Sequence, residues 1–133
     1  MMDILLDTHV LIWSLFDDDC IPQSVKDLID NPDNDIYFSV SSLWEIEIKH
    51  TKHPQSMPYS MRQIYNVVLG KTDFIMLDIR PEYLVILSET IKENVHNDPF
   101  DHVIISTAKS EKMKLITHDI AISKYKGIDI VLI

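Results

Sequence analysis

The regular alternation of short apolar runs with longer amphipathic segments is the feature that most constrains this fold. The runs are rich in β-branched and aromatic residues, stop at turn-forming residues, and are too short for buried helices, so they are predicted to be strands. The strands are expected at 3–6, 36–40, 74–77, 115–116 and 128–133. Because helical segments separate most of them, the chain is predicted to form an α/β fold, with a mostly parallel sheet and right-handed crossovers.

The segments between the strands have helical periodicity and recognisable ends. Helices are expected at 9–16, at 24–29, from Ser42 to about 50, at 60–69, after Pro81, and from Pro99 to about 112. Asp7 or Thr8 is expected to cap the first helix. Ser42 and Glu45 have the spacing of a capping box, which places Glu45 in the first turn of its helix. Gly70 is expected to end the fourth helix, and 51–58 is expected to be a loop or a break between helices.

The composition narrows the class of protein further. The chain has 133 residues, so we expect a single domain over 1–133. Hydrophobic residues make up 46% of the chain and charged residues 25%, which argues against disorder. Cys20 is the only cysteine, and no apolar run approaches the roughly 20 residues of a membrane span. We therefore expect a cytoplasmic protein with no membrane association.

The charge balance limits the partners. A net charge of -9 argues against a broad basic surface that holds nucleic acid non-specifically, and it makes a basic protein partner plausible. It does not exclude a nucleic-acid enzyme, because a site that collects carboxylates for divalent cations contributes negative charge itself.

The stretch from His96 to His102 places two acids at the start of a predicted helix. Asp98 suits the N-cap, Pro99 suits the first helical position, and Asp101 falls at the third. Taken alone, the two acids are explained by helix capping and by the helix dipole. Only acids that converge from distant parts of the chain would favour a site.

Other acids do follow predicted strands. Asp7 follows the first strand, Glu45 the second and Asp119 the fourth, while Asp98 and Asp101 open the helix that leads into the fourth. Because ligands of parallel α/β sheets bind beyond the carboxyl ends of the strands, we expect these five acids to share one site.

Such a cluster implies a particular chemistry. Carboxylates a few ångströms apart cannot all be ionised without a counter-charge, and a divalent cation provides one. A ligand set made only of oxygens favours Mg²⁺ or Mn²⁺ over zinc. The reaction best suited to this site is metal-assisted attack of water on a phosphodiester.

Four motifs in this sequence resemble those of PIN-domain ribonucleases, and most closely the VapC-like toxins of bacterial toxin–antitoxin systems. They are Leu-Leu-Asp-Thr-His-Val-Leu-Ile-Trp (5–13), Ser-Ser-Leu-Trp-Glu-Ile-Glu-Ile-Lys (41–49), His-Asn-Asp-Pro-Phe-Asp-His (96–102) and Ile-Thr-His-Asp (116–119). The resemblance covers nearly the whole chain. It implies a three-layer α/β/α PIN fold and a Mg²⁺- or Mn²⁺-dependent endoribonuclease, usually a homodimer, that cleaves tRNA, rRNA or mRNA. It also implies a cognate antitoxin that places a basic side chain in the acidic pocket.

The resemblance assigns roles by position. Asp7, Glu45, Asp101 and Asp119 match the metal-binding and catalytic quartet, and Asp98 matches an accessory metal-binding acid. His102 is a departure, because many relatives have arginine there.

Further candidates for contacts with the substrate are suggested by residue type and position. Lys49 belongs to a basic patch (Lys49, His50, Lys52 and His53) that would suit an RNA backbone or a solvated surface. Thr117 would suit a carboxylate or the scissile phosphate, or would be a turn hydroxyl. Three aromatic residues would suit base stacking, the core or a dimer interface: Trp13, Trp44 and Phe100.

Two rival functions remain open at this stage. The first is a non-catalytic binding module with the same fold. The second is a phosphoacceptor receiver domain, which requires adjacent acids after the first strand and a lysine at the end of the last strand. Leu6 precedes Asp7 here and the last strand extends to Ile133, so this rival fits poorly.

Overall fold

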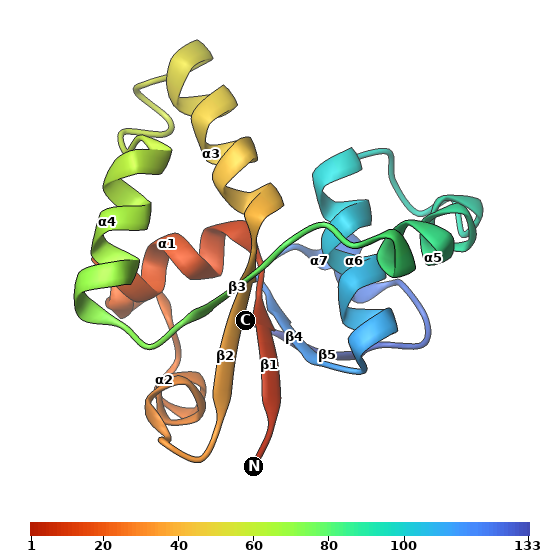
Figure 1. Cartoon of the computed structure of the whole chain (residues 1–133), viewed down its shortest axis with the longest axis horizontal. Helices are drawn as coiled ribbons and strands as arrows, with labels where there is room; N and C mark the ends of the chain where they lie inside the picture. The colour runs from red at the N-terminus through yellow and green to blue at the C-terminus, as the bar shows by residue number, and fades with distance from the viewer.

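The sheet contains five parallel strands in the order β3-β2-β1-β4-β5 (Figure 1). This computed structural model describes all 133 residues. The strands are β1 (Asp3–Leu6), β2 (Asp35–Ser39), β3 (Ile75–Leu77), β4 (Lys114–Thr117) and β5 (Asp129–Leu132). Every strand pair is parallel, so the predicted α/β class with a mostly parallel sheet is confirmed. Receiver domains have the strand order 2-1-3-4-5, so the topology rules that rival out.

Helices cover both faces of the sheet, which gives the predicted three layers (Figure 1). Helices on the first face are α1 (Thr8–Phe16), α2 (Gln23–Asp30), α3 (Val40–Lys52) and α4 (Met61–Lys71), with the short 3-10 helix η1 (Asp18–Cys20) after α1. Helices on the second side are α5 (Pro81–Lys92), α6 (Pro99–Glu111) and α7 (Ile120–Ser123). The latter two pack on the sheet, and α5 packs against α6.

The central strand β1 explains why the sheet is buried on both faces. Ile4 and Leu6 belong to the apolar cluster under α1–α4, while Leu5 belongs to the cluster with α6 and α7. All three side chains are fully buried. A strand whose neighbouring side chains enter two separate cores has a continuous apolar run rather than an alternating pattern. This strand therefore fixes the position of Asp7, which follows it directly.

Helix α3 begins earlier than the sequence predicted. Ser39 is its N-cap and its hydroxyl accepts from the Ser41 backbone N–H at 3.1 Å, so the predicted capping box at Ser42 is wrong. The hydroxyl of Ser42 lies 2.9 Å from that of Thr8, a long-range partner that the local pattern does not reveal. Glu45 consequently lies in the second turn of the helix, and α3 extends to Lys52, inside the predicted loop.

Gly70 does not end helix α4. The helix extends to Lys71, and the backbone N–H of Thr72 then donates to the carbonyl of Val68. Gly70 lies inside the helix and does not have the positive φ typical of a helix-ending glycine, which only Gly127 has, at 79°. A glycine inside a helix is tolerated at a cost of about 1 kcal/mol relative to alanine, so its presence did not by itself require a helix end.

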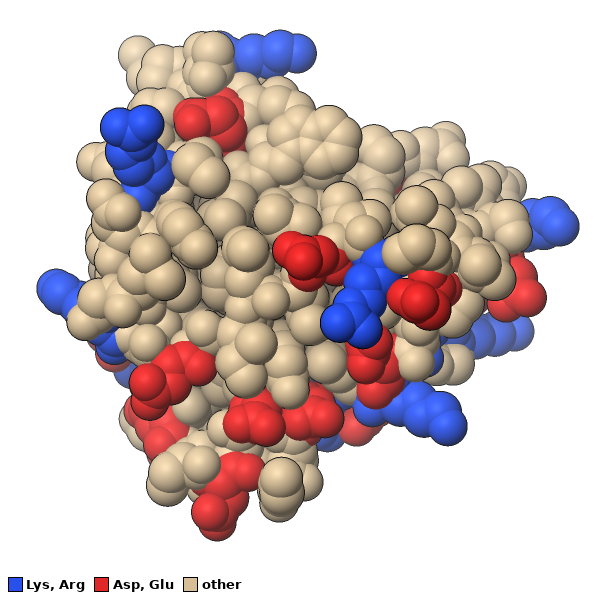
Figure 2. Space-filling model, viewed as in Figure 1, with Lys and Arg blue, Asp and Glu red and all other residues tan.

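Charged side chains are mixed on the surface. On the face drawn in Figure 2, lysine and arginine side chains lie among acidic ones, without a continuous basic surface. No helix has the length and apolar character needed to cross a bilayer.

A core substitution tests the central position of β1. We expect Leu5→Ala to lower the free energy of unfolding by about 2–5 kcal/mol, because Leu5 is fully buried and the surrounding sheet cannot collapse into the cavity. Leu84→Ala on α5, where the side chain is 47% exposed, is the matched control and is expected to cost less than about 1 kcal/mol. Urea unfolding followed by circular dichroism measures both. Equal effects would show that β1 is not the core strand.

Candidate metal centre

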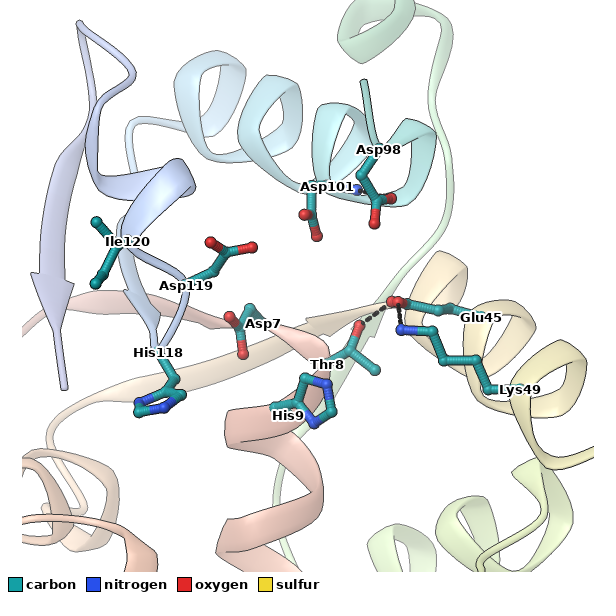
Figure 3. A pocket seen from close by; sticks show the side chains of 10 residues that line it. All are labelled: Asp7, Thr8, His9, Glu45, Lys49, Asp98, Asp101, His118, Asp119 and Ile120. Carbon is teal, nitrogen blue, oxygen red and sulfur yellow. Dashed lines mark hydrogen bonds and ion pairs between the residues drawn. The ribbon is translucent and has the colours of Figure 1, made fainter. Parts of the chain in front are cut away.

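A pocket of about 430 Å³ opens at the carboxyl edge of the sheet (Figure 3). Its lining contains all five acids that the sequence singled out. The lining residues are Asp7, Thr8, His9, Glu45, Lys49, Asp98, Asp101, His118, Asp119 and Ile120. The structure therefore brings the five acids together, from four separate segments of the chain.

Asp7 lies at the base of the pocket and is held from two sides. It is the N-cap of α1, and its Oδ1 accepts from the Val10 backbone N–H at 2.9 Å. Its Oδ2 accepts from the hydroxyl of Thr117 at the end of β4. The backbone N–H of Asp119 in turn donates to the Thr117 hydroxyl at 3.0 Å. Thr117 thus links Asp7 to Asp119 and, being fully buried, orients a carboxylate instead of facing the solvent.

Glu45 enters the pocket from α3 and is 4% exposed. Its Oε1 accepts from the hydroxyl of Thr8 at 2.7 Å, and its Oε2 lies 2.6 Å from Nζ of Lys49, one helical turn further on. The carboxylate is therefore paired with a cation of the same helix (Figure 3).

Asp98 and Asp101 come from the first turn of α6 and its cap. Oδ1 of Asp98 accepts from the backbone N–H groups of Phe100 at 2.9 Å and Asp101 at 3.2 Å. Asp98 is thus a helix cap, as its position before Pro99 predicted, and it also lines the pocket. The Asp101 side chain is 14% exposed, and its Oδ2 lies 2.9 Å from Nε2 of His96.

Asp119 lies on the opposite wall from Asp101, and both carboxylates are turned into the pocket (Figure 3). It caps the short helix α7, because its Oδ1 accepts from the Ala121 backbone N–H at 2.8 Å. It is the exposed member of the acidic cluster.

The electrostatics of the pocket favour a bound cation. Burial raises the pKa of Asp7, although its hydrogen bonds oppose the shift. Burial, with the nearby charges of Asp98 and Glu45, raises the pKa of Asp101 to about 7. Burial opposes the charge of Lys49, but its hydrogen bond to Glu45 and the surrounding acids outweigh this effect and raise its pKa. The carboxylates are therefore crowded enough to repel one another.

The donor set fits Mg²⁺ or Mn²⁺. Five carboxylates line one small pocket, and hard divalent cations prefer oxygen ligands of this kind. A nitrogen lies close to this set, because ligand atoms of His96, Asp101 and Asp119 are all within 4.8 Å of one another.

Several polar residues around the acids escaped the sequence analysis. Thr8 and Ser42 hold Glu45 through a chain of hydroxyls, and His96 contacts Asp101. His96 is five residues before Asp101, outside helical spacing, so no periodic signal pointed to it. The sequence analysis also missed the apolar Ile120, which lines the pocket and is 64% exposed. Only its position directly after Asp119 could have indicated that it lies there.

The remaining candidates have different surroundings. Of the basic patch, only Lys49 lines the pocket. His102 is buried, and its Nε2 donates to the His96 carbonyl at 2.8 Å, because a carbonyl oxygen can only accept. Trp13 is half-buried against His118, whereas Trp44 is 59% exposed and meets Phe100 edge-on with 5.0 Å between ring centroids.

The fold and the pocket define a class of parallel α/β proteins that gather carboxylates at the carboxyl edge of the sheet. The family model of the PIN domain matches residues 4–128, so this chain belongs to the PIN domain family. The predicted family is therefore confirmed.

Solved structures share the fold. A chain in the crystal structure of VapBC2 from Rickettsia felis, bound to a DNA fragment from their promoter, has 18% identity and a TM-score of 0.74, with 98% of each chain covered. A chain of DNA-bound VapBC from Salmonella typhimurium has 18% identity and a TM-score of 0.72, again with 98% of each chain covered. VapBC-5 from Mycobacterium tuberculosis, a member of the VapBC family of toxin-antitoxin systems, has 19% identity and a TM-score of 0.62, covering 100% of this chain and 98% of that chain. No match is found among curated proteins.

The raised pKa of Asp101 predicts how stability depends on pH. A carboxyl group whose pKa is higher in the folded state than in the unfolded state stabilises the fold most when protonated, and this contribution is lost as the pH rises through the folded pKa. Asparagine does not titrate, so we compare the free energy of unfolding of Asp101→Asn with that of wild type, both in chelator. The variant should gain stability relative to wild type as the pH rises from 4 to 8, with most of the change below pH 7 or so, about the pKa of Asp101 in the folded state. Urea unfolding at several pH values measures it. A difference that does not change with pH would contradict the prediction.

Proposed function

We propose that this PIN-domain chain is a Mg²⁺- or Mn²⁺-dependent endoribonuclease and the toxin of a VapC-type toxin–antitoxin pair. The observation that carries the proposal is the convergence of Asp7, Glu45, Asp98, Asp101 and Asp119 on one pocket, without a serine or cysteine in its lining. Such a pocket supports hydrolysis by metal-activated water, a reaction that needs no nucleophilic serine or cysteine.

We assign each pocket residue a role from its position. When bound, the divalent cation supplies a Lewis acid and lowers the pKa of water. Asp7 and Asp101 hold the cation directly, and Asp119 holds it directly or through water. Glu45 orients the attacking water or holds a second cation, and Asp98 adds negative charge beside it. Thr117 keeps Asp7 and Asp119 in place through its two hydrogen bonds.

Lys49 is the one lysine or arginine of the lining, and it has a separate task. It balances the charge of Glu45 in the metal-free pocket, with its side chain still 43% exposed. If Glu45 held a metal ion, the Lys49 ammonium group would be available to a phosphate of the RNA backbone.

The partners follow from the same proposal. The structural neighbours belong to VapBC complexes, which supports a cognate antitoxin, and tRNA, rRNA or mRNA is the proposed substrate. We also propose that the chain acts in the cytoplasm as a homodimer. The acidic pocket is complementary to a basic side chain of the antitoxin.

Cleavage of total RNA by the purified protein, freed of any antitoxin, tests the proposal. With Mn²⁺ we expect discrete fragments, and chelator, Asp7→Asn and Asp101→Asn should each reduce the rate at least about 100-fold, because each removes the cation or one of its ligands. Asp33→Asn, at an exposed turn before β2, is the control and should cleave like wild type.

Other outcomes are equally informative. A folded protein that binds Mn²⁺ but cleaves nothing would favour the non-catalytic binding module. Cleavage that survives both pocket substitutions would show that the activity lies elsewhere.

The role of Lys49 is tested separately. We expect Lys49→Gln to raise KM for RNA about fivefold, the equivalent of about 1 kcal/mol for a partly exposed phosphate contact. Mn²⁺ should bind the variant at least as tightly as wild type, because a competing positive charge is gone. Initial rates and calorimetric titration measure the two effects. Weaker Mn²⁺ binding would show that Lys49 supports the acids structurally instead.

A further inference from the structure

His96 lies behind the metal centre, in the segment between α5 and α6. Its Nε2 lies 2.9 Å from Oδ2 of Asp101, and its side chain is 20% exposed. It is absent from the pocket lining, so it reaches the pocket through Asp101.

The other ring nitrogen of His96 also has a partner. Nδ1 lies 2.9 Å from the hydroxyl of Tyr125, which follows α7. An ionised carboxylate can only accept, so a hydrogen bond to Asp101 requires the proton on Nε2, and Nδ1 of a neutral ring then accepts from the Tyr125 hydroxyl. That hydroxyl also lies 3.4 Å from the His96 carbonyl, which it reaches as the alternative acceptor. Tyr125 is therefore compatible with the tautomer that serves the carboxylate.

The ring of His96 is held in place by its neighbours. The ring centroids of His102 and Tyr125 both lie 5.5 Å from that of His96, in edge-on arrangements. Its backbone carbonyl lies 2.8 Å from Nε2 of His102. A side chain restrained in this way can impose its geometry on a flexible partner.

The same contacts join the two walls of the pocket. Asp101 belongs to the first turn of α6, whereas Tyr125 follows the helix that Asp119 caps. A second contact joins the segment after α7 to the end of α5, since the Lys126 backbone N–H donates to Oε1 of Glu93 at 2.9 Å. The contact between His96 and Tyr125 is therefore one of those that hold Asp101 and Asp119 at their separation.

We infer that His96 is a positioning residue for the metal centre: it fixes the carboxylate of Asp101 through Oδ2 and leaves Oδ1 for the cation. This inference rests on the proposed function, since it assumes that Asp101 is a metal ligand. Without the donor, repulsion from Asp98 and Glu45 turns the Asp101 carboxylate out of its binding position. Loss of an outer-shell partner of this kind typically weakens metal binding about 10–100-fold.

The test compares two variants of His96, with glutamine or asparagine in its place, whose amide side chains differ by one methylene group. In His96→Gln the amide nitrogen is as many bonds from Cα as Nε2 is, so it can still donate to Asp101. In His96→Asn the amide nitrogen corresponds to Nδ1 and cannot reach Asp101. We expect calorimetric titration with Mn²⁺ to show affinity within about threefold of wild type for His96→Gln, and a loss of at least about tenfold for His96→Asn. A purely structural role would not separate the two variants.

A third variant keeps the test decisive if an amide destabilises the fold. Tyr125→Phe leaves His96 in place and removes the hydroxyl that lies 2.9 Å from its Nδ1, so we expect Mn²⁺ affinity to fall about threefold or more. Thermal unfolding in chelator shows which variants are folded. Wild-type affinity in folded His96→Asn or in folded Tyr125→Phe would overturn the inference, as would equal losses in both amide variants.

Electron spin echo spectroscopy of the Mn²⁺ complex gives a second readout. We expect no coupling from a directly bound histidine nitrogen; such a coupling, lost in His96→Gln, would make His96 a ligand and overturn the positioning role. A wild-type protein that binds no Mn²⁺ would instead overturn the proposed function itself, and with it this inference.

Discussion

The crowding of negative charge at the carboxyl edge of the sheet is the constraint on which the rest of this structure depends. Asp7 and Glu45 are almost fully buried and Asp101 largely so, at a cost that only specific partners can offset. Hydroxyl groups donate to Asp7 and Glu45, an imidazole N–H donates to Asp101, and Glu45 also has a charged partner in Lys49 at 2.6 Å. Hydroxyl donors orient a carboxylate without cancelling its charge, so the pocket keeps its attraction for a cation.

Helix N-termini provide much of this support. Asp7, Asp98 and Asp119 are each the N-cap of a helix and each accept hydrogen bonds from backbone N–H groups. Capping uses the oxygen that accepts from the backbone, and the second oxygen remains for another partner. The capping and metal-site interpretations of these residues are therefore compatible, because one carboxylate can do both.

The parallel topology allows carboxylates that cap helices to face one pocket. With β1 at the centre, the segments after β1, β2 and β4 emerge side by side at one edge, and α6 adds its first turn from the second face. The acids thus reach the pocket from rigid helix starts, which hold a side chain more accurately than long loops do. The same arrangement ties the geometry of the acidic pocket to fold stability, since each cap also stabilises its own helix.

The sequence by itself determined the strands, the helices other than the short α7, and the residues that could form a site. Its apolar runs are buried strands, and the placement of Asp7, Glu45 and Asp119 after three of them was enough to predict their convergence, because parallel strands end at one edge. These are local patterns combined with one topological rule. They were least reliable at element ends, as the start of α3 at Val40 and the continuation of α4 past Gly70 show.

Only the tertiary structure decided which side chains serve the acids. Ser42 has the local features of a helix cap, yet it bonds with Thr8, while Thr117 reaches Asp7 across most of the chain length. His96 contacts Tyr125 because the segments before α6 and after α7 lie against each other, while it also contacts Asp101. Such partners depend on the order of the strands and on the packing of helices, which a local pattern does not encode. The physical reason is that a hydrogen bond depends on distance in space, whereas a motif records only distance along the chain.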